Sequence, residues 1–456
     1  MRQLGPSSRL LGQGPARLIA DRVWQAAELL QLRDTIAQRL AGHVPAAAAV
    51  AIVGTNSGEG VALLGAALDL EHPILLLPAS LRPDEAAGAL ISAAIGFVVA
   101  PAAALSRLSL AGWRAVWEER DIRLLARAGL ETDSPIDGLP VLCQLTSGST
   151  GPSRFAVRSL DGVAREADVV AETLHLELAD RVLCASSIAH SYALVGGLIA
   201  ASRRGAEVIL APAPGEAAAR AAAVNPSVFF GLPGSYRVLL NQPGAFRPRL
   251  ALSAGAPLPD GLYDAFLRAT GIPIRQDYGT TETGTIALDA GPEPSPHTVG
   301  HTLPHLEVDL SPVGEVLVRS QSVAAVYIEN GQLVPALGPG GWYHTGDLGS
   351  RDAPGRLRLS GRVRPPLEVD GEVVPPERVE EMIAAHQAVR EVVVLPMRAA
   401  DGRPALRAVV VAPGLTAPEL RDWCVDRLPS AFVPAELELR DSLPYSPAGK
   451  LLRKYL

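Results

Sequence analysis

A segment rich in glycine and hydroxyl groups, residues 146–152, directly follows a run with the apolar residues Val141, Leu142 and Leu145. Glycine lets the backbone approach a ligand closely and adopt positive φ, while hydroxyl and free N–H groups donate hydrogen bonds to anionic oxygen. The segment therefore predicts a phosphate-binding loop. A flexible Ser/Gly linker is disfavoured because the basic Arg154 and the apolar run 155–157 follow at once. The spacing G-x-x-x-x-G-K-[ST] is absent, so this loop differs from that of P-loop NTPases.

Strands and helices are expected to alternate on both sides of this loop. Helices are predicted at 18–40, 61–68, from Pro83 onward, at 163–174 and at 193–201. Short apolar strands are predicted at 50–53, 74–78, 97–100, 181–185, 207–210, 226–231, 249–253 and 274–278. This alternation is typical of a doubly wound α/β sheet with helices on both faces, in which ligands collect at the carboxyl ends of the strands.

The pattern changes after Gly300, where strands alternate with turns and indicate a small antiparallel or barrel-like β subdomain. Beyond Arg362 a compact stretch has helices near 376–386 and 418–427 and strands near Val392 and Ala408. We therefore expect an α/β protein with two domains. Residues 1–362 would form a large domain of doubly wound sheets with the β subdomain, and residues 363–456 a small α+β domain.

Composition excludes several classes of function. The 456 residues are 48% hydrophobic and 20% charged, which indicates a soluble globular chain with an ample core. The net charge of −7 is spread along the chain without a basic run, so nucleic acid is not an expected partner. Cys143, Cys184 and Cys424 lie far apart without a C-x-x-C pair, which favours a reducing compartment over disulfides or a zinc cluster.

One uncharged stretch, residues 86–105, has about the length of a membrane span. Pro83 begins a helix well, Gly96 ends one, and 97–100 is typical of a short strand, so a helix followed by a buried strand is the better interpretation. Residues 1–6 show no apolar signal segment. We expect a cytoplasmic protein without a membrane partner.

Four further motifs follow the loop in a fixed order: Q-D-Y-G-T-T-E at 276–282, Y-H-T-G-D at 343–347, G-R at 361–362 and P-A-G-K at 447–450. Each motif alone is weakly specific, but five in this order are strongly so. Together they resemble the acyl-adenylate-forming superfamily of acyl-CoA synthetases, luciferases and peptide-synthetase adenylation domains. The resemblance implies ATP and Mg²⁺ as cofactors, and a mobile C-terminal domain that rotates about a hinge at Arg364.

Side-chain chemistry supports the ATP site that the resemblance implies. Tyr278 offers a flat ring for adenine, with a core aromatic as the alternative, and Gln276 can donate and accept at the base edge. Asp347 can accept from both ribose hydroxyls and Arg362 can donate alongside it. For residues 255–257 an ordinary turn is the alternative. The predicted cofactor-binding residues are Thr146, Ser147, Gly148, Ser149, Thr150, Gly151, Arg154, Gly255, Ala256, Pro257, Gln276, Asp277, Tyr278, Gly279, Thr280, Asp347 and Arg362.

The predicted catalytic residues are Thr281, Glu282, Lys450 and His190. Thr281 can donate to a phosphate oxygen, and Glu282 is a hard oxygen ligand for Mg²⁺ bridging the phosphates; a solvated surface Glu is the alternative. By resemblance, the Lys450 cation would bridge the substrate carboxylate and the α-phosphate, where such charge stabilisation is worth a factor of about 10²–10³ in rate.

Three residues depart from the common pattern of the superfamily. Arg154 stands where a lysine is usual and keeps the cation. Glu368 stands where a lysine often serves the second half-reaction, which leaves the nature of the acceptor open. The hinge position, usually Asp or Lys, is Arg364, which can still act as a pivot.

The segment 189–194 aligns with the part of the superfamily that lines the acid pocket. Amino-acid-activating members place an Asp where this chain has Ser191, and an unpaired buried ammonium would be costly, so a free amino acid is disfavoured. An aromatic or small apolar carboxylic acid is expected instead. The predicted pocket residues are His190, Ser191, Tyr192, Phe230 and Gly231. A structural histidine is the alternative for His190, and core packing is the alternative for Phe229, Phe230 and Gly231.

His297, His301 and His305 are spaced by four residues, as three metal ligands on a helix would be. Prolines and a glycine between them forbid a continuous helix, so no metal site is expected there.

The predicted reaction is ATP-dependent ligation of a carboxylic acid. An acyl-AMP forms with release of pyrophosphate, and the acyl group then passes to CoA or to the phosphopantetheine of an acyl or aryl carrier protein. Two alternatives remain: an amide synthetase that passes the acyl group to an amine, and a non-catalytic adenylate-binding homologue. The joint presence of Glu282, Asp347, Arg362 and Lys450 argues against the non-catalytic alternative.

Overall fold

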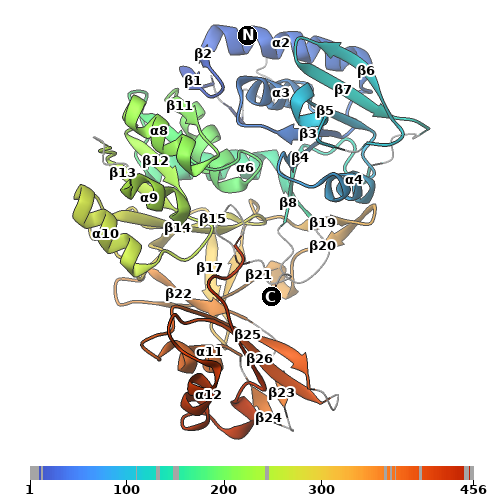
Figure 1. Ribbon diagram of the computed structural model, residues 1–456. Coiled ribbons are helices and arrows are strands. Elements are labelled where there is room, and N and C mark those ends of the chain that lie inside the picture. The colour runs from blue at the N-terminus through green and yellow to red at the C-terminus, as the bar shows by residue number, and fades with distance from the viewer. Residues whose placement is uncertain are drawn as a thin grey trace. The chain divides into compact units, whose positions relative to one another are not determined.

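The computed structural model divides the chain into two compact units (Figure 1). The first contains Met1–Pro312, Val316–Thr345 and Ser350–Leu359, and the second contains Val313–Glu315, Gly346–Gly349 and Ser360–Leu456. The structure describes residues 10–11, 14–108, 110–129, 134–146, 154–241, 246–363, 367–369, 372–374, 376–399, 403–445, 451 and 456.

The first unit contains two nine-stranded sheets. One has the strand order β16-β15-β14-β13-β12-β10-β11-β1-β2 and is parallel from β14 to β1. Its strands are β1 (Arg17–Ile19), β2 (Val23–Gln25), β10 (Arg181–Cys184), β11 (Glu207–Leu210), β12 (Val228–Gly231), β13 (Leu250–Ser253), β14 (Ile274–Thr280), β15 (Gly284–Leu288) and β16 (His301–Thr302).

The second sheet has the order β20-β19-β9-β8-β4-β3-β5-β7-β6 and is parallel from β8 to β5. Its strands are β3 (Val50–Gly54), β4 (Ile74–Pro78), β5 (Phe97–Pro101), β6 (Trp113–Glu119), β7 (Ile122–Arg127), β8 (Val141–Leu145), β9 (Phe155–Ser159), β19 (Val326–Glu329) and β20 (Gln332–Pro335).

Helices fill the space between the two sheets and cover their outer faces. Alternation along the strands separates the layers: Val182 belongs to the central core, whereas its neighbour Leu183 belongs to the outer core of the first sheet. The central core contains residues of α2 (Ala26–His43), α3 (Gly58–Asp69), α6 (Leu160–Thr173) and η1 (Tyr192–Ile199). The outer helices are α8 (Pro214–Val224), α9 (Pro233–Leu240) and α10 (Asp260–Thr270) on the first sheet and α4 (Pro83–Ser92) on the second.

A four-stranded sheet follows in the order β17-β18-β21-β22, and the boundary between the units passes through β21 and β22. Its strands are β17 (Glu307–Leu310), β18 (Glu315–Arg319), β21 (Tyr343–Arg351) and β22 (Leu357–Arg362). The second unit has its own apolar core. Its elements are β23 (Leu367–Val369), β24 (Glu372–Val374), α11 (Pro376–Ala384), β25 (Glu391–Arg398), β26 (Pro404–Val411), α12 (Ala417–Val425) and β27 (Glu436–Leu439).

The predicted fold class, an α/β protein with large N-terminal sheets and a small C-terminal α+β domain, is confirmed. The helix predicted at 18–40 is wrong in its first part, because Arg17–Ile19 pairs with β11 and Val23–Gln25 extends the sheet. The helix begins only at Ala26. Tertiary pairing has overridden the helical spacing of the apolar residues.

The uncharged stretch 86–105 forms most of α4, then β5 and then the short α5 (Ala102–Leu105). The prediction of a helix followed by a strand is therefore confirmed. Within the described ranges, none of the helices combines the length and the apolar character that crossing a bilayer demands.

Candidate active site

The carboxyl ends of four neighbouring parallel strands bring predicted site residues to one edge of the first sheet. In the strand register, Cys184 pairs with Phe230, Gly231 with Ser253, and Ser253 with Gln276. The segments that follow these strands therefore leave the sheet side by side. They carry His190 to Tyr192 after β10, Gly255 to Pro257 after β13, and Asp277 to Glu282 at the end of β14 and beyond.

A tight turn between β14 and β15 holds Thr281 and Glu282. Thr280 and Thr283 clamp the turn, since the Thr283 hydroxyl accepts from the Thr280 amide at 3.2 Å and the Thr280 hydroxyl accepts from the Thr283 amide at 3.2 Å. Gly284 has φ +69°, a conformation that glycine adopts without strain. A side chain at Gly279 would overlap the Gly284 carbonyl. The small residues of the motif are thus required by the turn itself.

The Glu282 carboxylate is held by tyrosine. Its Oε1 accepts a hydrogen bond from the Tyr327 hydroxyl at 3.1 Å, and the Tyr343 hydroxyl lies 3.5 Å from that of Tyr327. Burial, with the Glu282 charge, raises the pKa of Tyr327 to about 12 and also raises the pKa of Tyr343. Both hydroxyls therefore stay protonated at neutral pH and can donate. With 9% of its surface exposed, Glu282 is a buried, oriented carboxylate, contrary to the surface-residue alternative.

Arg154 connects this carboxylate to the predicted phosphate loop. The Thr146 amide donates to the Arg154 carbonyl at 2.8 Å, so the two residues close the base of the loop. The Arg154 guanidinium lies over the Tyr327 ring, 4.5 Å from its centroid. A cation, an aromatic ring and a carboxylate thus follow one another at the base of the loop. Residues 147–151, which complete the predicted loop, lie outside the described residues.

Three residues on β14 that are predicted to bind the nucleotide are buried: Gln276, Asp277 and Tyr278. Gln276 donates both N–H bonds of its amide to backbone carbonyls, of Pro296 at 2.8 Å and of Thr298 at 3.0 Å. Donation to a base edge would require one of these bonds to break, whereas the amide oxygen can still accept. The Tyr278 ring, 7% exposed, belongs to a buried apolar cluster, as the core-aromatic alternative requires.

Asp277 and Glu166 of α6 share a hydrogen-bond donor residue, because Thr285 donates its hydroxyl to Asp277 at 3.4 Å and its amide to Glu166 at 2.8 Å. Burial and the Glu166 charge raise the pKa of Asp277 to about 8, and a hydrogen bond from Thr285 opposes this rise. At neutral pH the Asp277 carboxyl is therefore mostly protonated.

Tyr192 and Phe230, two of the predicted pocket residues, are in ring contact, with centroids 5.3 Å apart. Tyr192 begins the π-helix η1, which packs directly on β10 because a Cβ at Gly197 would overlap the Cys184 sulfur. Phe230 and Gly231 are fully buried, as the core-packing alternative requires. Part of His190 reaches the surface, yet enough protein surrounds its imidazole that desolvation lowers the pKa of the ring.

In the second unit, Arg362 and Asp347 form an ion pair, with Arg362 Nε 3.0 Å from Asp347 Oδ1. The backbone supports the arrangement: the Gly346 amide donates to Glu315 Oε1 at 3.0 Å, and Gly346 has φ +71°. The two residues predicted to bind ribose are therefore brought together. The hinge Arg364 and the predicted catalytic Lys450 lie outside the described residues.

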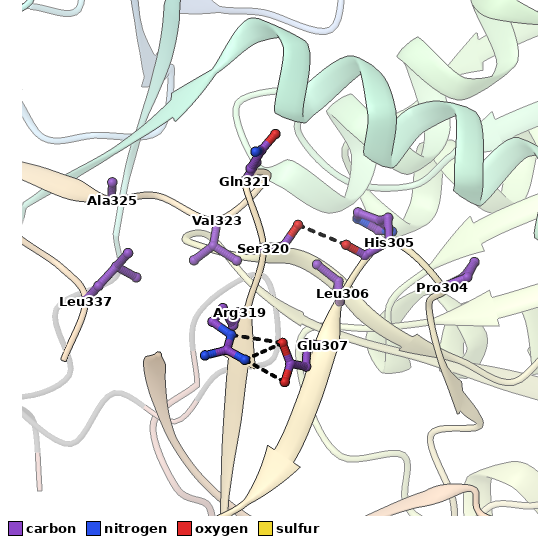
Figure 2. Close-up of a pocket in the computed structure, with 10 residues that line it drawn as sticks. All are labelled: Pro304, His305, Leu306, Glu307, Arg319, Ser320, Gln321, Val323, Ala325 and Leu337. Carbon is purple, nitrogen blue, oxygen red and sulfur yellow. Dashed lines mark hydrogen bonds and ion pairs between the residues drawn. The ribbon is translucent and has the colours of Figure 1, made fainter. Parts of the chain in front are cut away.

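An open cavity of about 750 Å³ lies beside β17 and β18 (Figure 2). Figure 2 shows the Arg319–Glu307 ion pair and the Ser320 hydroxyl donating to the His305 carbonyl. Burial and neighbouring arginines lower the pKa of His305 to about 4, so the ring is neutral. Among the described residues no cluster of potential metal ligands occurs, here or at the other spaced histidines.

Residues 16–328 match the family model of the AMP-binding enzyme, and residues 378–450 match that of the AMP-binding enzyme C-terminal domain. The chain belongs to the AMP-binding enzymes. The predicted family is thereby confirmed.

Curated relatives of this AMP-binding enzyme include aromatic-acid ligases. The chain is 32% identical over 339 residues to the anthranilate–CoA ligase of Pseudomonas aeruginosa, a match that covers 69% of this chain and 65% of the ligase. It thus spans slightly less than two thirds of that relative's length. The chain is 26% identical over 324 residues to the 3,4-dihydroxybenzoate–[aryl-carrier protein] ligase of Bacillus anthracis. This match covers 70% of this chain and 73% of that protein.

A solved structure shares the whole fold. The crystal structure of an anthranilate CoA ligase in complex with anthranoyl-AMP matches with a TM-score of 0.76 over 99% of this chain and 96% of the other. The sequence identity is 21%.

Four residues around the Glu282 turn of this AMP-binding enzyme were not predicted from its sequence: Arg158, Glu166, Tyr327 and Tyr343. Tyr343 stands within the quoted Y-H-T-G-D motif, so it could have been found there. Arg158 carried a weaker signal, as a charged residue that directly continues the apolar run 155–157. Glu166 and Tyr327 carried none, because their contacts join segments far apart in the chain.

Proposed function

We propose that this AMP-binding enzyme activates a carboxylic acid with ATP and transfers the acyl group to a thiol. A carboxylate oxygen attacks the α-phosphorus, pyrophosphate leaves, and acyl-AMP forms. The thiol of CoA or of a carrier-protein phosphopantetheine then attacks the acyl carbonyl and AMP leaves. The observation that carries the proposal is the buried Glu282 carboxylate, oriented by Tyr327 beside the Arg154 guanidinium at the base of the loop.

Glu282 fits a magnesium ion. Its Oε1 accepts from Tyr327, and a carboxylate has further lone pairs to offer a hard cation. Mg²⁺ bound there would neutralise charge on the phosphates. The protein's own part is to orient the carboxylate and to place the Arg154 cation near the phosphates.

The second unit supplies the remaining proposed groups. The Asp347 carboxylate accepts from the ribose hydroxyls, with Arg362 holding it in place. Lys450 places its cation between the substrate carboxylate and the α-phosphate, and the unit pivots at Arg364 between the two half-reactions. These assignments rest on the motifs and on the match of residues 378–450 to the family's C-terminal domain.

An aromatic acid is the proposed substrate. The Arg158 guanidinium donates to the Ser191 hydroxyl at 3.3 Å. Ser191 stands where amino-acid-activating members of the superfamily carry an aspartate, so this position offers an ammonium no carboxylate. Without a carboxylate partner at that position, desolvation disfavours an ammonium there. The names of the two ligases compared above, for anthranilate and 3,4-dihydroxybenzoate, also favour an aromatic acid.

The exchange of labelled pyrophosphate into ATP tests the proposal directly. Over a panel of aryl, fatty and amino acids, we expect exchange with at least one aryl acid and none with the free amino acids. If no acid in the panel supports exchange, the ligase function is wrong. Product analysis with CoA, a carrier protein and amines offered together then separates thioester formation from the amide synthetase alternative.

Replacing Tyr327 by Phe is expected to raise the Mg²⁺ concentration needed for half-maximal exchange by about tenfold, because partners that orient a metal ligand typically contribute 10–100-fold. The change removes the hydroxyl that donates to Glu282 while keeping the ring beneath Arg154. A magnesium titration of exchange measures it. Tyr263→Phe on α10, a buried tyrosine of the outer core, is the matched control and should leave the titration unchanged. An equal shift in both variants would contradict the role of Tyr327.

A further inference from the structure

A fully buried ion pair lies behind the Glu282 turn. Arg158 Nη2 donates to Glu166 Oε2 at 2.6 Å, and both side chains are 1% exposed. Arg158 is on β9 and Glu166 is on α6, eight residues later, and Arg158 is the largest fully buried side chain among the described residues. A buried pair contributes little stability compared with apolar residues of the same volume. Its distinctive effect is to fix the groups that it binds.

The arginine binds two further segments. Its Nε donates to the Ser322 carbonyl at 3.1 Å, and its Nη1 donates to the Ser191 hydroxyl at 3.3 Å. Ser322 precedes β19, and Ser191 directly precedes the π-helix η1 in the predicted acid pocket. One planar guanidinium therefore joins helix α6, the acid pocket and the segment before β19, in fixed directions that lysine could not match.

Glu166 holds the Glu282 turn itself. Its Oε1 accepts from the Thr285 amide at 2.8 Å, at the end of the turn. A side chain at Gly284 would overlap the Glu166 carboxylate, so the turn packs directly against it. At the other end of the same network, two residues after Ser322, the Ala324 amide donates to the Glu282 carbonyl at 2.8 Å. The pair thus holds the turn by two separate routes.

We propose that Arg158 and Glu166 are a positioning pair that fixes the Glu282 turn relative to Ser191 and so couples the nucleotide end of the site to the acid pocket. The proposal depends on the proposed function for the identity of the two ligands. Arg158 and Glu166 touch neither reacting group; they act through Thr285, the Ala324–Glu282 bond and Ser191. Loss of the pair should therefore weaken binding of both Mg·ATP and the acid.

Two variants test the pair. Glu166→Gln keeps an oxygen that can accept from the Thr285 amide but removes the charge that Arg158 binds. The double variant Arg158→Met/Glu166→Leu replaces the pair by apolar side chains, a change that buried pairs often tolerate without loss of stability. Asp180→Asn is the matched control: it breaks the Asp180–Arg249 pair, 2.7 Å apart, at the amino end of β10.

The dissociation constant for Mg·ATP is measured by calorimetry without acid, the KM for the acid by pyrophosphate exchange, and folding by thermal melting. We expect both folded variants to raise the dissociation constant about tenfold, within the range found for residues that orient a binding group, and to raise the acid KM several-fold. Asp180→Asn should leave the dissociation constant for Mg·ATP and the KM for the acid within twofold of wild type, whatever it does to the melting temperature. Because the double variant also removes the acceptor of the Thr285 amide and the donors to Ser322 and Ser191, it should lose at least as much Mg·ATP affinity as Glu166→Gln.

A folded double variant, or folded Glu166→Gln, that binds Mg·ATP as tightly as wild type overturns the proposal. Absence of exchange in the wild type counts against the proposed function alone, because the calorimetric comparison needs no acid. If the wild type binds no Mg·ATP, the turn has no nucleotide to position and the positioning role is overturned as well.

Discussion

Glu282→Gln is expected to lower the rate of pyrophosphate exchange at saturating ATP and acid by about 10²-fold, which corresponds to about 2.7 kcal/mol of transition-state stabilisation. Glutamine keeps the size of the side chain and an oxygen that can accept from Tyr327. It lacks the negative charge that a hard divalent cation requires of its ligand. The loss should therefore fall on magnesium-dependent chemistry and leave the fold intact.

Two measurements separate this charge effect from damage to the turn. Raising the Mg²⁺ concentration should recover part of the lost rate in Glu282→Gln, and the melting temperature should stay close to that of the wild type. Glu293→Gln makes the same chemical change at an exposed side chain and should exchange at the wild-type rate. A Glu282→Gln variant with wild-type rate and wild-type magnesium dependence would remove Glu282 from the site.

The sequence allowed prediction of the motifs, and with them the family, because each motif is local. Gly279, Thr280 and Gly284 lie within six residues of one another, and their types follow from the geometry of one tight turn. The loop at 146–152 could likewise be recognised from composition alone. Local requirements of this kind appear directly in the order of residue types.

The surroundings of the turn could not be predicted, because they depend on contacts between distant segments. Arg158 reaches Ser322 across 164 positions, and Tyr327 reaches Glu282 across 45. A buried arginine in a strand differs from an exposed one only in what packs against it. The same limit explains Gln276, whose amide donors were expected to face adenine but bind the carbonyls of Pro296 and Thr298.

The first helix shows how tertiary pairing can override a local pattern. Apolar residues between 18 and 40 recur at helical spacing, but β1 pairs with β11, a strand about 190 residues away in the chain. Trp24 is 4% exposed and packs against Gly58, where a Cβ would overlap the indole ring. Burial of this edge against the sheet stabilises strands where propensity alone favours a longer helix.

Lys450→Ala is expected to reduce the rate of acyl-AMP formation by about 10²–10³-fold, the cost of losing one group that stabilises a developing anion. The sequence makes this test specific, because Lys450 and Lys454 are the only lysines among its 41 lysine and arginine residues. A lysine ammonium is a compact point charge on a flexible stem, whereas arginine presents a rigid planar fork. An arginine-rich chain that has lysine at this motif position favours a role for the compact cation.

Lys454→Ala is the matched control for Lys450→Ala, because it removes the other lysine four residues away. Pyrophosphate exchange should persist in it at the wild-type rate and fall in Lys450→Ala, with Mg·ATP binding in the absence of acid nearly equal in the two variants. Lys450→Arg tests the point-charge argument: it keeps the positive charge but should recover only a small part of the rate. Full exchange in Lys450→Ala would exclude the lysine from the adenylation step, and equal losses in both alanine variants would point to a general effect of charge at this end of the chain.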